Sequence, residues 1–187
     1  GRALALIEDI PESTDRYRSE TKLQIAFGVA SMSTKGFAAP DVEHSYLRAR
    51  ELAQLSGDNS HLFTATWGRW LFDQVTTRYQ GAQDLSDELL VLAEQQEDTG
   101  IELQAHHAAW TTRFVLGDFS STLKHTNAGT RLYDVEEHCL HAYHYGGHDP
   151  GVCGLSFQAI TFWLAGWPDQ ARDDALKAIT LSENLNQ

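Results

Sequence analysis

The sequence predicts an all-α protein in which about four helix pairs stack as a right-handed superhelix. Two observations carry this prediction. Apolar residues recur at helical spacing in segment after segment, as at Val42, Tyr46 and Ala49. The same set of positions then returns at a nearly constant interval along the chain. No segment alternates between apolar and polar residues for long enough to form a strand.

Apolar stripes, prolines and turn residues place the helices in order. Proline is tolerated in the first helical turn, where its missing N–H would be unpaired anyway, and Asp149-Pro150 is the clearest such start. Glycines 117 and 166 stand where a helix end needs a left-handed residue. The expected helices cover 15–35, 40–56, 60–78, 82–97, 100–116, 118–132, 150–165 and 168–184, and residues 3–10 look like the tail of one more.

The second helix of each pair repeats a set of mostly small residues, spaced by four and then three positions. The sets begin 40, 40 and 49 residues apart. Small side chains at these positions let the second helix lie close against the first. The alternative is an irregular helix bundle with coincidental spacing. The sets are Val42/Tyr46/Ala49, Ala82/Ser86/Leu89, Thr122/Thr126/Gly129 and Ala171/Ala175/Ala178.

These repeats predict one helical domain over 1–187, with pairs at about 15–56, 60–97, 100–132 and 150–184 and an insert at 134–149. The chain opens without a methionine, and we interpret it as a piece of a longer protein. Two cysteines are too few for a disulfide framework, which favours a cytoplasmic location.

Charge excludes two classes of partner. The 187 residues include 26 acidic and 14 basic side chains, for a net charge of −12. Nucleic acid and anionic membranes both need Lys and Arg to neutralise phosphate. We therefore expect neither as a partner. No stretch reaches the roughly 20 apolar residues that span a bilayer.

Several motifs resemble known repeat families. Residues 116–119 (LGDF), the small positions and 132–134 (LYD) look like a tetratricopeptide repeat. The wider pattern resembles the C-terminal helical repeat region of bacterial predicted signalling ATPases, which are often fused to a class III adenylate or guanylate cyclase domain. The motifs that carry this resemblance are 34–43 (TKGFAAPDVE), 67–70 (WGRW), 105–108 (AHHA) and 145–153 (YGGHDPGVC).

The resemblance implies a scaffold or sensor attached to catalytic domains that lie elsewhere. No glycine in this chain is followed by Lys-Ser or Lys-Thr, so the phosphate-binding loop of an ATPase is missing. We expect no catalysis and no cofactor here, and a peptide, a neighbouring domain or a small effector as the partner. The sequence departs from the tetratricopeptide pattern at Trp70 and Trp110, where a small residue is usual.

A histidine-rich insert is the densest set of potential metal ligands. Its candidates are His138, His141, His144 and His148, which approach one another if the segment is helical. Without a Cys-x-x-Cys or His-Glu-x-x-His motif, we expect hydrogen-bonding or solvated histidines instead. A metal-dependent enzyme that uses 138–148 is the alternative function. His106 and His107 lack a nearby nucleophile, so we expect structural hydrogen bonds there too.

First helices line the concave surface of such a stack, which is where scaffolds hold their partners. Counting back from glycines 117 and 166 in the tetratricopeptide register gives the inner-face positions. An error of one position would rotate this face by about 100°. Phe162 and Trp163 are expected in the core. The predicted groove residues are Trp67, Leu71, His107, Thr111, Phe114, Ser156 and Ile160.

Overall fold

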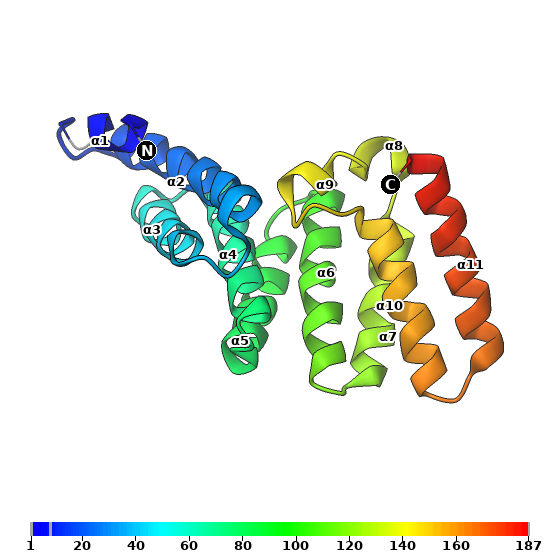
Figure 1. Cartoon of the computed structure of the whole chain (residues 1–187). Coiled ribbons are helices and arrows are strands. Elements are labelled where there is room, and N and C mark those ends of the chain that lie inside the picture. Colours follow the sequence, from blue (N-terminus) through cyan, green and yellow to red (C-terminus); the bar gives the residue numbers. More distant parts are fainter. Residues whose placement is uncertain (1, 8, 187) are drawn as a thin grey trace. The chain divides into compact units, whose positions relative to one another are not determined.

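The computed structural model describes residues 2–7 and 9–186, and within them it contains helices and turns but no strand (Figure 1). This confirms the all-α prediction. Each expected helix is present, with ends within three residues of the predicted ones. The helices are α1 (Arg2–Ile7), α2 (Thr14–Lys35), α3 (Pro40–Ser56), α4 (Asn59–Val75), α5 (Tyr79–Glu94), α6 (Thr99–Val115), α7 (Phe119–Leu132), α8 (Val135–His138), α9 (His141–His144), α10 (Pro150–Leu164) and α11 (Pro168–Leu185).

The chain divides into two compact units after Leu85. In the first unit α2 packs on α3, α3 on α4, and α2 also on α4, while α1 lies against α2. In the second unit α6 packs on α7, α7 on α10 and α10 on α11, and α10 also contacts α6. Consecutive helices thus pack as neighbours from α1 to α4, and so do α6 with α7 and α10 with α11.

Aspartates begin four of the longer helices by capping their free N–H groups. The side chains of Asp58, Asp98, Asp118 and Asp149 each accept a hydrogen bond from the backbone N–H three residues later, over 2.9 to 3.2 Å. Pro150 then occupies the first turn of α10 as expected. The turns from α6 to α7 and from α10 to α11 each contain a glycine with positive φ. The angle is 77° at Gly117 and 85° at Gly166, a backbone conformation that favours glycine.

The repeated second-helix positions face the core. Eleven of the twelve residues in the four sets are buried, and Ala175 is half-buried. The burial that their spacing predicts is thus confirmed.

Two large aromatic residues are matched by glycines on adjacent helices. A Cβ placed on Gly68 would lie 2.1 Å from the Tyr46 ring, and one on Gly28 would lie 2.7 Å from it. In the second unit, a Cβ on Gly129 would lie 2.4 Å from the Trp110 ring. The wholly buried Trp110 thus fits where the pattern expects a small residue, because α7 supplies the missing volume.

The insert is less regular than the rest. It forms two four-residue helices, α8 and α9, separated by Cys139 and Leu140. Asp134 begins α8 by accepting hydrogen bonds from the N–H groups of Glu136 and Glu137.

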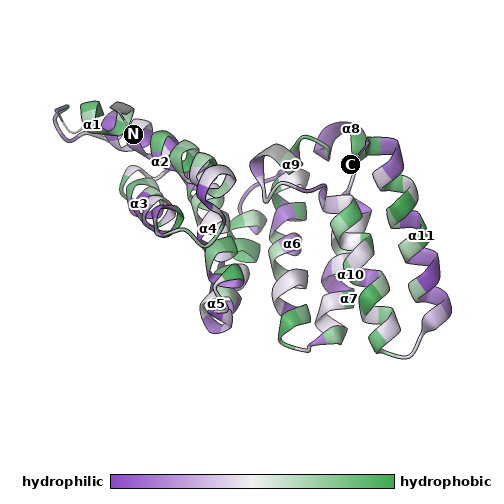
Figure 2. Cartoon of the chain, in the orientation of Figure 1, coloured by the Kyte–Doolittle hydropathy of each residue, from purple (hydrophilic) through white to green (hydrophobic). Residues whose placement is uncertain are grey.

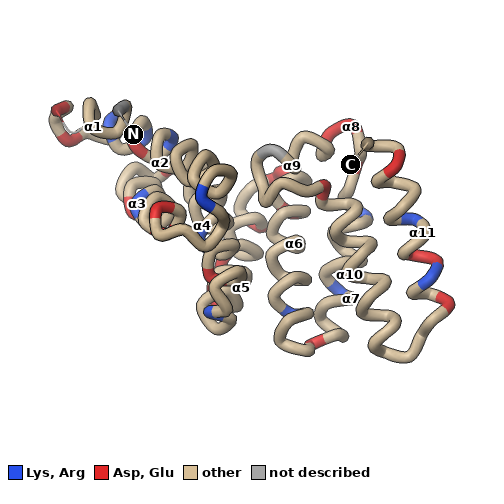
Figure 3. The backbone as a smooth tube through the Cα atoms, in the orientation of Figure 1, with Lys and Arg blue, Asp and Glu red and all other residues tan. Residues whose placement is uncertain are grey.

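Apolar and charged residues are unevenly shared between α10 and α11. Figure 2 shows α10 as mainly hydrophobic and α11 as mixed, and Figure 3 shows charges of both signs on α11. The sequence of α10 contains no Lys, Arg, Asp or Glu. Among the described helices, none combines the length and the apolar character that crossing a bilayer would require.

We predict that Gly129→Ala destabilises the protein by about 1–3 kcal/mol, because the new methyl group overlaps the Trp110 ring. A loss of stability is informative, because Gly→Ala inside a helix otherwise stabilises a protein by about 1 kcal/mol. Urea unfolding of Gly129→Ala, Trp110→Phe and the double variant measures the coupling. Because the phenylalanine ring is smaller, Trp110→Phe should recover part of the stability that Gly129→Ala loses. Strict additivity of the two single changes would contradict this packing.

Candidate functional site

The predicted groove residues differ in exposure. Trp67 and His107 are each 2% exposed, so in this structure they belong to the interior of their units. Leu71, Thr111, Phe114 and Ser156 are half-buried. Ile160 is 50% exposed. The groove as a binding surface stays a prediction, and Ile160 is its most accessible member.

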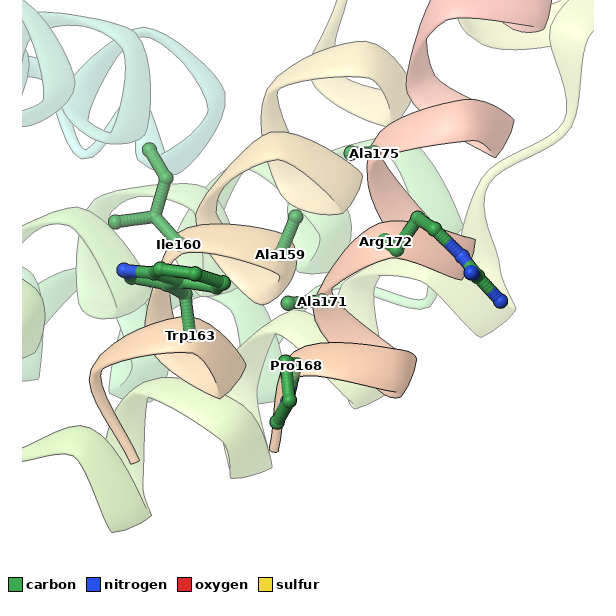
Figure 4. A pocket seen from close by; sticks show the side chains of 7 residues that line it. All are labelled: Ala159, Ile160, Trp163, Pro168, Ala171, Arg172 and Ala175. Carbon is green, nitrogen blue, oxygen red and sulfur yellow. The ribbon is translucent and has the colours of Figure 1, made fainter. Parts of the chain in front are cut away.

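An apolar groove runs between α10 and α11 and encloses about 330 Å³ (Figure 4). Ile160 and Trp163 lie side by side on α10, while Arg172 extends away from the groove. Trp163 is 66% exposed, which corrects the expectation that it lies in the core. Phe162 is half-buried and stacks on Trp167 with 5.6 Å between ring centroids. The other lining residues are Ala159, Pro168, Ala171 and Ala175.

A second cluster joins α6 to the start of α10. Nε2 of His107 lies 3.2 Å from Nε2 of His148 and 3.4 Å from Sγ of Cys153. Potential ligand atoms of the three residues all lie within 4.8 Å of one another. His107 is buried, Cys153 half-buried and His148 exposed, so the cluster reaches the surface on the His148 side.

Hydrogen bonds orient both imidazoles of this cluster. Nδ1 of His107 lies 3.1 Å from Oε1 of Gln104, and Nδ1 of His148 lies 3.2 Å from the carbonyl oxygen of Gly146. The Gly146 carbonyl can only accept, so Nδ1 of His148 carries the proton, and with the Gln104 amide in this orientation Nδ1 of His107 carries it too. Trp110 stacks on His107, with 4.9 Å between ring centroids and 22° between ring planes.

Burial decides the protonation of these groups. It holds the pKa of His107 well below its usual value, and His148 adds to this effect. Burial also raises the pKa of the Cys153 thiol to about 12. In the metal-free protein His107 is therefore neutral and Cys153 is a thiol.

His106, adjacent to His107 in sequence, has a different partner. Its Nδ1 lies 3.0 Å from Nδ1 of His125 on α7. Glu102, one turn earlier, is 3.9 Å from Nε2 of His106. Both histidines of this pair thus have hydrogen-bonding partners, but the two side chains belong to separate sites.

The insert histidines predicted as metal candidates do not gather as one group. His148 belongs to the cluster, but His138 instead accepts a hydrogen bond at Nδ1 from the N–H of Asp134, over 2.9 Å. Nδ1 of His141 lies 3.0 Å from the amide nitrogen of Gln104, and His144 is exposed. His107 was missed as a partner of His148 because it lies 41 residues from it in the sequence.

Asp149 anchors the start of α10 beside this cluster. It is 1% exposed, and its two oxygens accept hydrogen bonds from Val152 N–H and from the Tyr133 hydroxyl, each over 2.9 Å. Burial, with the adjacent Asp149 carboxylate, raises the pKa of Tyr133.

We predict that Asp149→Ala destabilises the protein by about 2–3 kcal/mol, because it removes a helix cap and leaves a half-buried hydroxyl without its acceptor. Asp118→Ala is the matched control, since Asp118 is an exposed cap whose loss costs about 1 kcal/mol. Thermal and urea unfolding measure both. Equal losses would show that the Tyr133 contact contributes nothing.

We predict that stability falls between pH 7 and pH 5. Burial, followed by the charges of His106, Arg113 and Lys124, lowers the pKa of His125 to about 4, while Asp87 acts in the opposite direction. The unfolded chain binds this proton near pH 6.5, so stability is lost as pH falls from about 6.5 towards about 4.

After allowance for partial exposure, His125 accounts for about 1 kcal/mol of this loss at pH 5. Urea unfolding at pH 5 and pH 7 should therefore show a smaller pH dependence in His125→Gln. His44→Gln, at an exposed histidine, should behave as the wild type does. An unchanged dependence in His125→Gln would refute the assignment.

Comparisons with known proteins give one relative and no family. No family model matches the chain. An uncharacterized protein of Rhizobium meliloti (strain 1021) is 30% identical over 176 residues, which cover 93% of this chain and 17% of that protein. The chain thus spans 17% of the length of the relative that it matches.

Proposed function

We propose that this chain is a non-catalytic helical-repeat scaffold or sensor within a larger protein, of the signalling ATPase or nucleotidyl cyclase type. In this proposal the helices belong to a right-handed tetratricopeptide-like superhelix, and the face formed by α10 and α11 receives an apolar helix. The observation that carries the proposal is the exposure of Trp163.

Trp163 occupies the position of a residue that is partly covered in the preceding pair. In the register of glycines 117 and 166, which are 49 residues apart, Trp163 corresponds to Phe114. The Phe114 ring meets the edge of Phe157 on α10, with 5.2 Å between centroids and 90° between planes. A following helix would cover Trp163 in the same way that α10 covers Phe114.

Neighbouring residues extend this exposed apolar face. Leu164, Trp167, Leu176 and Ile179 are each between 51% and 56% exposed. A concentration of exposed apolar residues on two adjacent helices is typical of an interaction site. Small residues on the groove floor, Ala159 and Ala171, allow a helix backbone to approach closely.

Packing within each unit supports the repeat architecture. First helices lie on first helices, α2 on α4 and α6 on α10, and α7 lies between α6 and α10. This is the contact pattern of stacked helical hairpins, in which each pair rests on the next. The relative, of which the matched region makes up 17%, is long enough to hold further pairs and other domains.

The groove provides the test. We predict that Ile160→Ser combined with Trp163→Ser weakens binding to the remainder of the parent protein, expressed separately, by at least about tenfold in Kd. Both side chains are exposed in this chain, so the double variant should unfold within about 0.5 kcal/mol of the wild type. Isothermal titration calorimetry measures the binding.

Leu140→Ser is the matched control, since Leu140 is an apolar residue, 59% exposed, that does not line the groove. It should bind as the wild type does. Equal binding by the double variant and the control would refute the docking surface. Cyclic nucleotide synthesis by this chain alone would refute its non-catalytic role.

A further inference from the structure

Two separations between ligand atoms in the His107 cluster are close to those of a tetrahedral zinc site. With Zn–N of about 2.05 Å and Zn–S of about 2.3 Å, two nitrogens lie about 3.3 Å apart, and a nitrogen and a sulfur about 3.6 Å apart. The observed separations from Nε2 of His107 are 3.2 Å to Nε2 of His148 and 3.4 Å to Sγ of Cys153. Because potential ligand atoms of all three residues lie within 4.8 Å of one another, one ion between them would reach all three after an adjustment of the side chains.

The protonation of the two imidazoles also calls for a cation. Because Gln104 and Gly146 accept hydrogen bonds from the Nδ1 atoms, both Nε2 atoms carry lone pairs, and these lone pairs face each other. Two lone pairs at this distance repel each other, and a cation between them would remove the repulsion. Metal-binding histidines are held in the same way, with the second ring nitrogen donating to a carbonyl group.

From these two observations we propose that His107, His148 and Cys153 bind a divalent cation of the zinc type. Imidazole nitrogen and a thiolate form a ligand set that zinc prefers. On binding, the Cys153 S–H proton is released to solvent and the sulfur binds the ion as a thiolate. Three protein ligands leave the fourth position to water, on the side where His148 is exposed.

The site goes beyond the proposed scaffold function, and it would act as a cross-link. His107 lies on α6, His148 at the end of the insert, and Cys153 in α10, so one ion would tie the three segments together. The buried Asp149 carboxylate, between His148 and Cys153 in sequence, would offset part of the added positive charge.

The test uses the whole chain without a polyhistidine tag. After incubation with Zn²⁺ and dialysis, elemental analysis should find one equivalent of zinc. At free zinc about 100 times Kd, the melting temperature should rise by at least about 2 °C. With Co²⁺, a thiolate-to-metal charge-transfer band should appear in the near ultraviolet.

Variants assign the ligands. His148→Ala and Cys153→Ser should each weaken zinc binding by at least about tenfold, and Cys153→Ser should abolish the charge-transfer band. His148 is exposed and serine is close in size to cysteine, so both variants should keep the fold, which circular dichroism checks. They test the site even if His107→Ala fails to fold. His144→Ala and Cys139→Ser, from the same insert, are the matched controls and should bind zinc normally.

Two results would overturn the proposal. One is the absence of bound zinc after dialysis. The other is zinc binding that depends on His144 or Cys139 but is unaffected by His148→Ala and Cys153→Ser. In either case the three side chains form a network of hydrogen bonds instead, with Nε2 of His107 protonated and the Gln104 amide rotated.

Discussion

The structure depends on close contact between a large aromatic ring and a glycine on an adjacent helix. Tyr46 in the first unit and Trp110 in the second each leave no room for a Cβ at the facing glycine. These contacts set the distance between helices, because interiors are packed too densely to absorb a methyl group. Trp110 also stacks on His107, so the packing that places α7 against α6 also orients an imidazole of the cluster.

Most of the helices could be predicted because their signals are local. Periodicity, N-terminal prolines and capping aspartates act within a few residues, and the 40-residue interval reports the repeat directly. The ligand cluster is not local. His107 reaches His148 and Cys153, 41 and 46 residues away, through the contact of α6 with α10. Proximity in sequence favoured the insert histidines, two of which instead bond to Asp134 and Gln104.

The predicted groove residues differ in exposure for a physical reason. The tetratricopeptide register assumes a small residue where this chain has Trp70 and Trp110. These rings fill the space between helices, and Trp67 and His107 are buried beside them, with centroids 5.1 and 4.9 Å away. Ile160, whose pair has an alanine at the position of Trp110, stays exposed. The accessible surface therefore lies where the first helix carries the smaller residue.

Helix α10 has the composition of an interior helix. Without a charged residue, its outer face cannot hydrate as α11 does through its acidic and basic side chains (Figure 3). At its amino end Asp149 caps the helix and accepts a hydrogen bond from the Tyr133 hydroxyl, and α10 also contacts α6. Its carboxyl half instead exposes Ile160, Trp163 and Leu164. A helix that is apolar all round is stable when it is covered on both sides. Under the proposed function, a partner on the uncovered half of α10 would account for the apolar residues there.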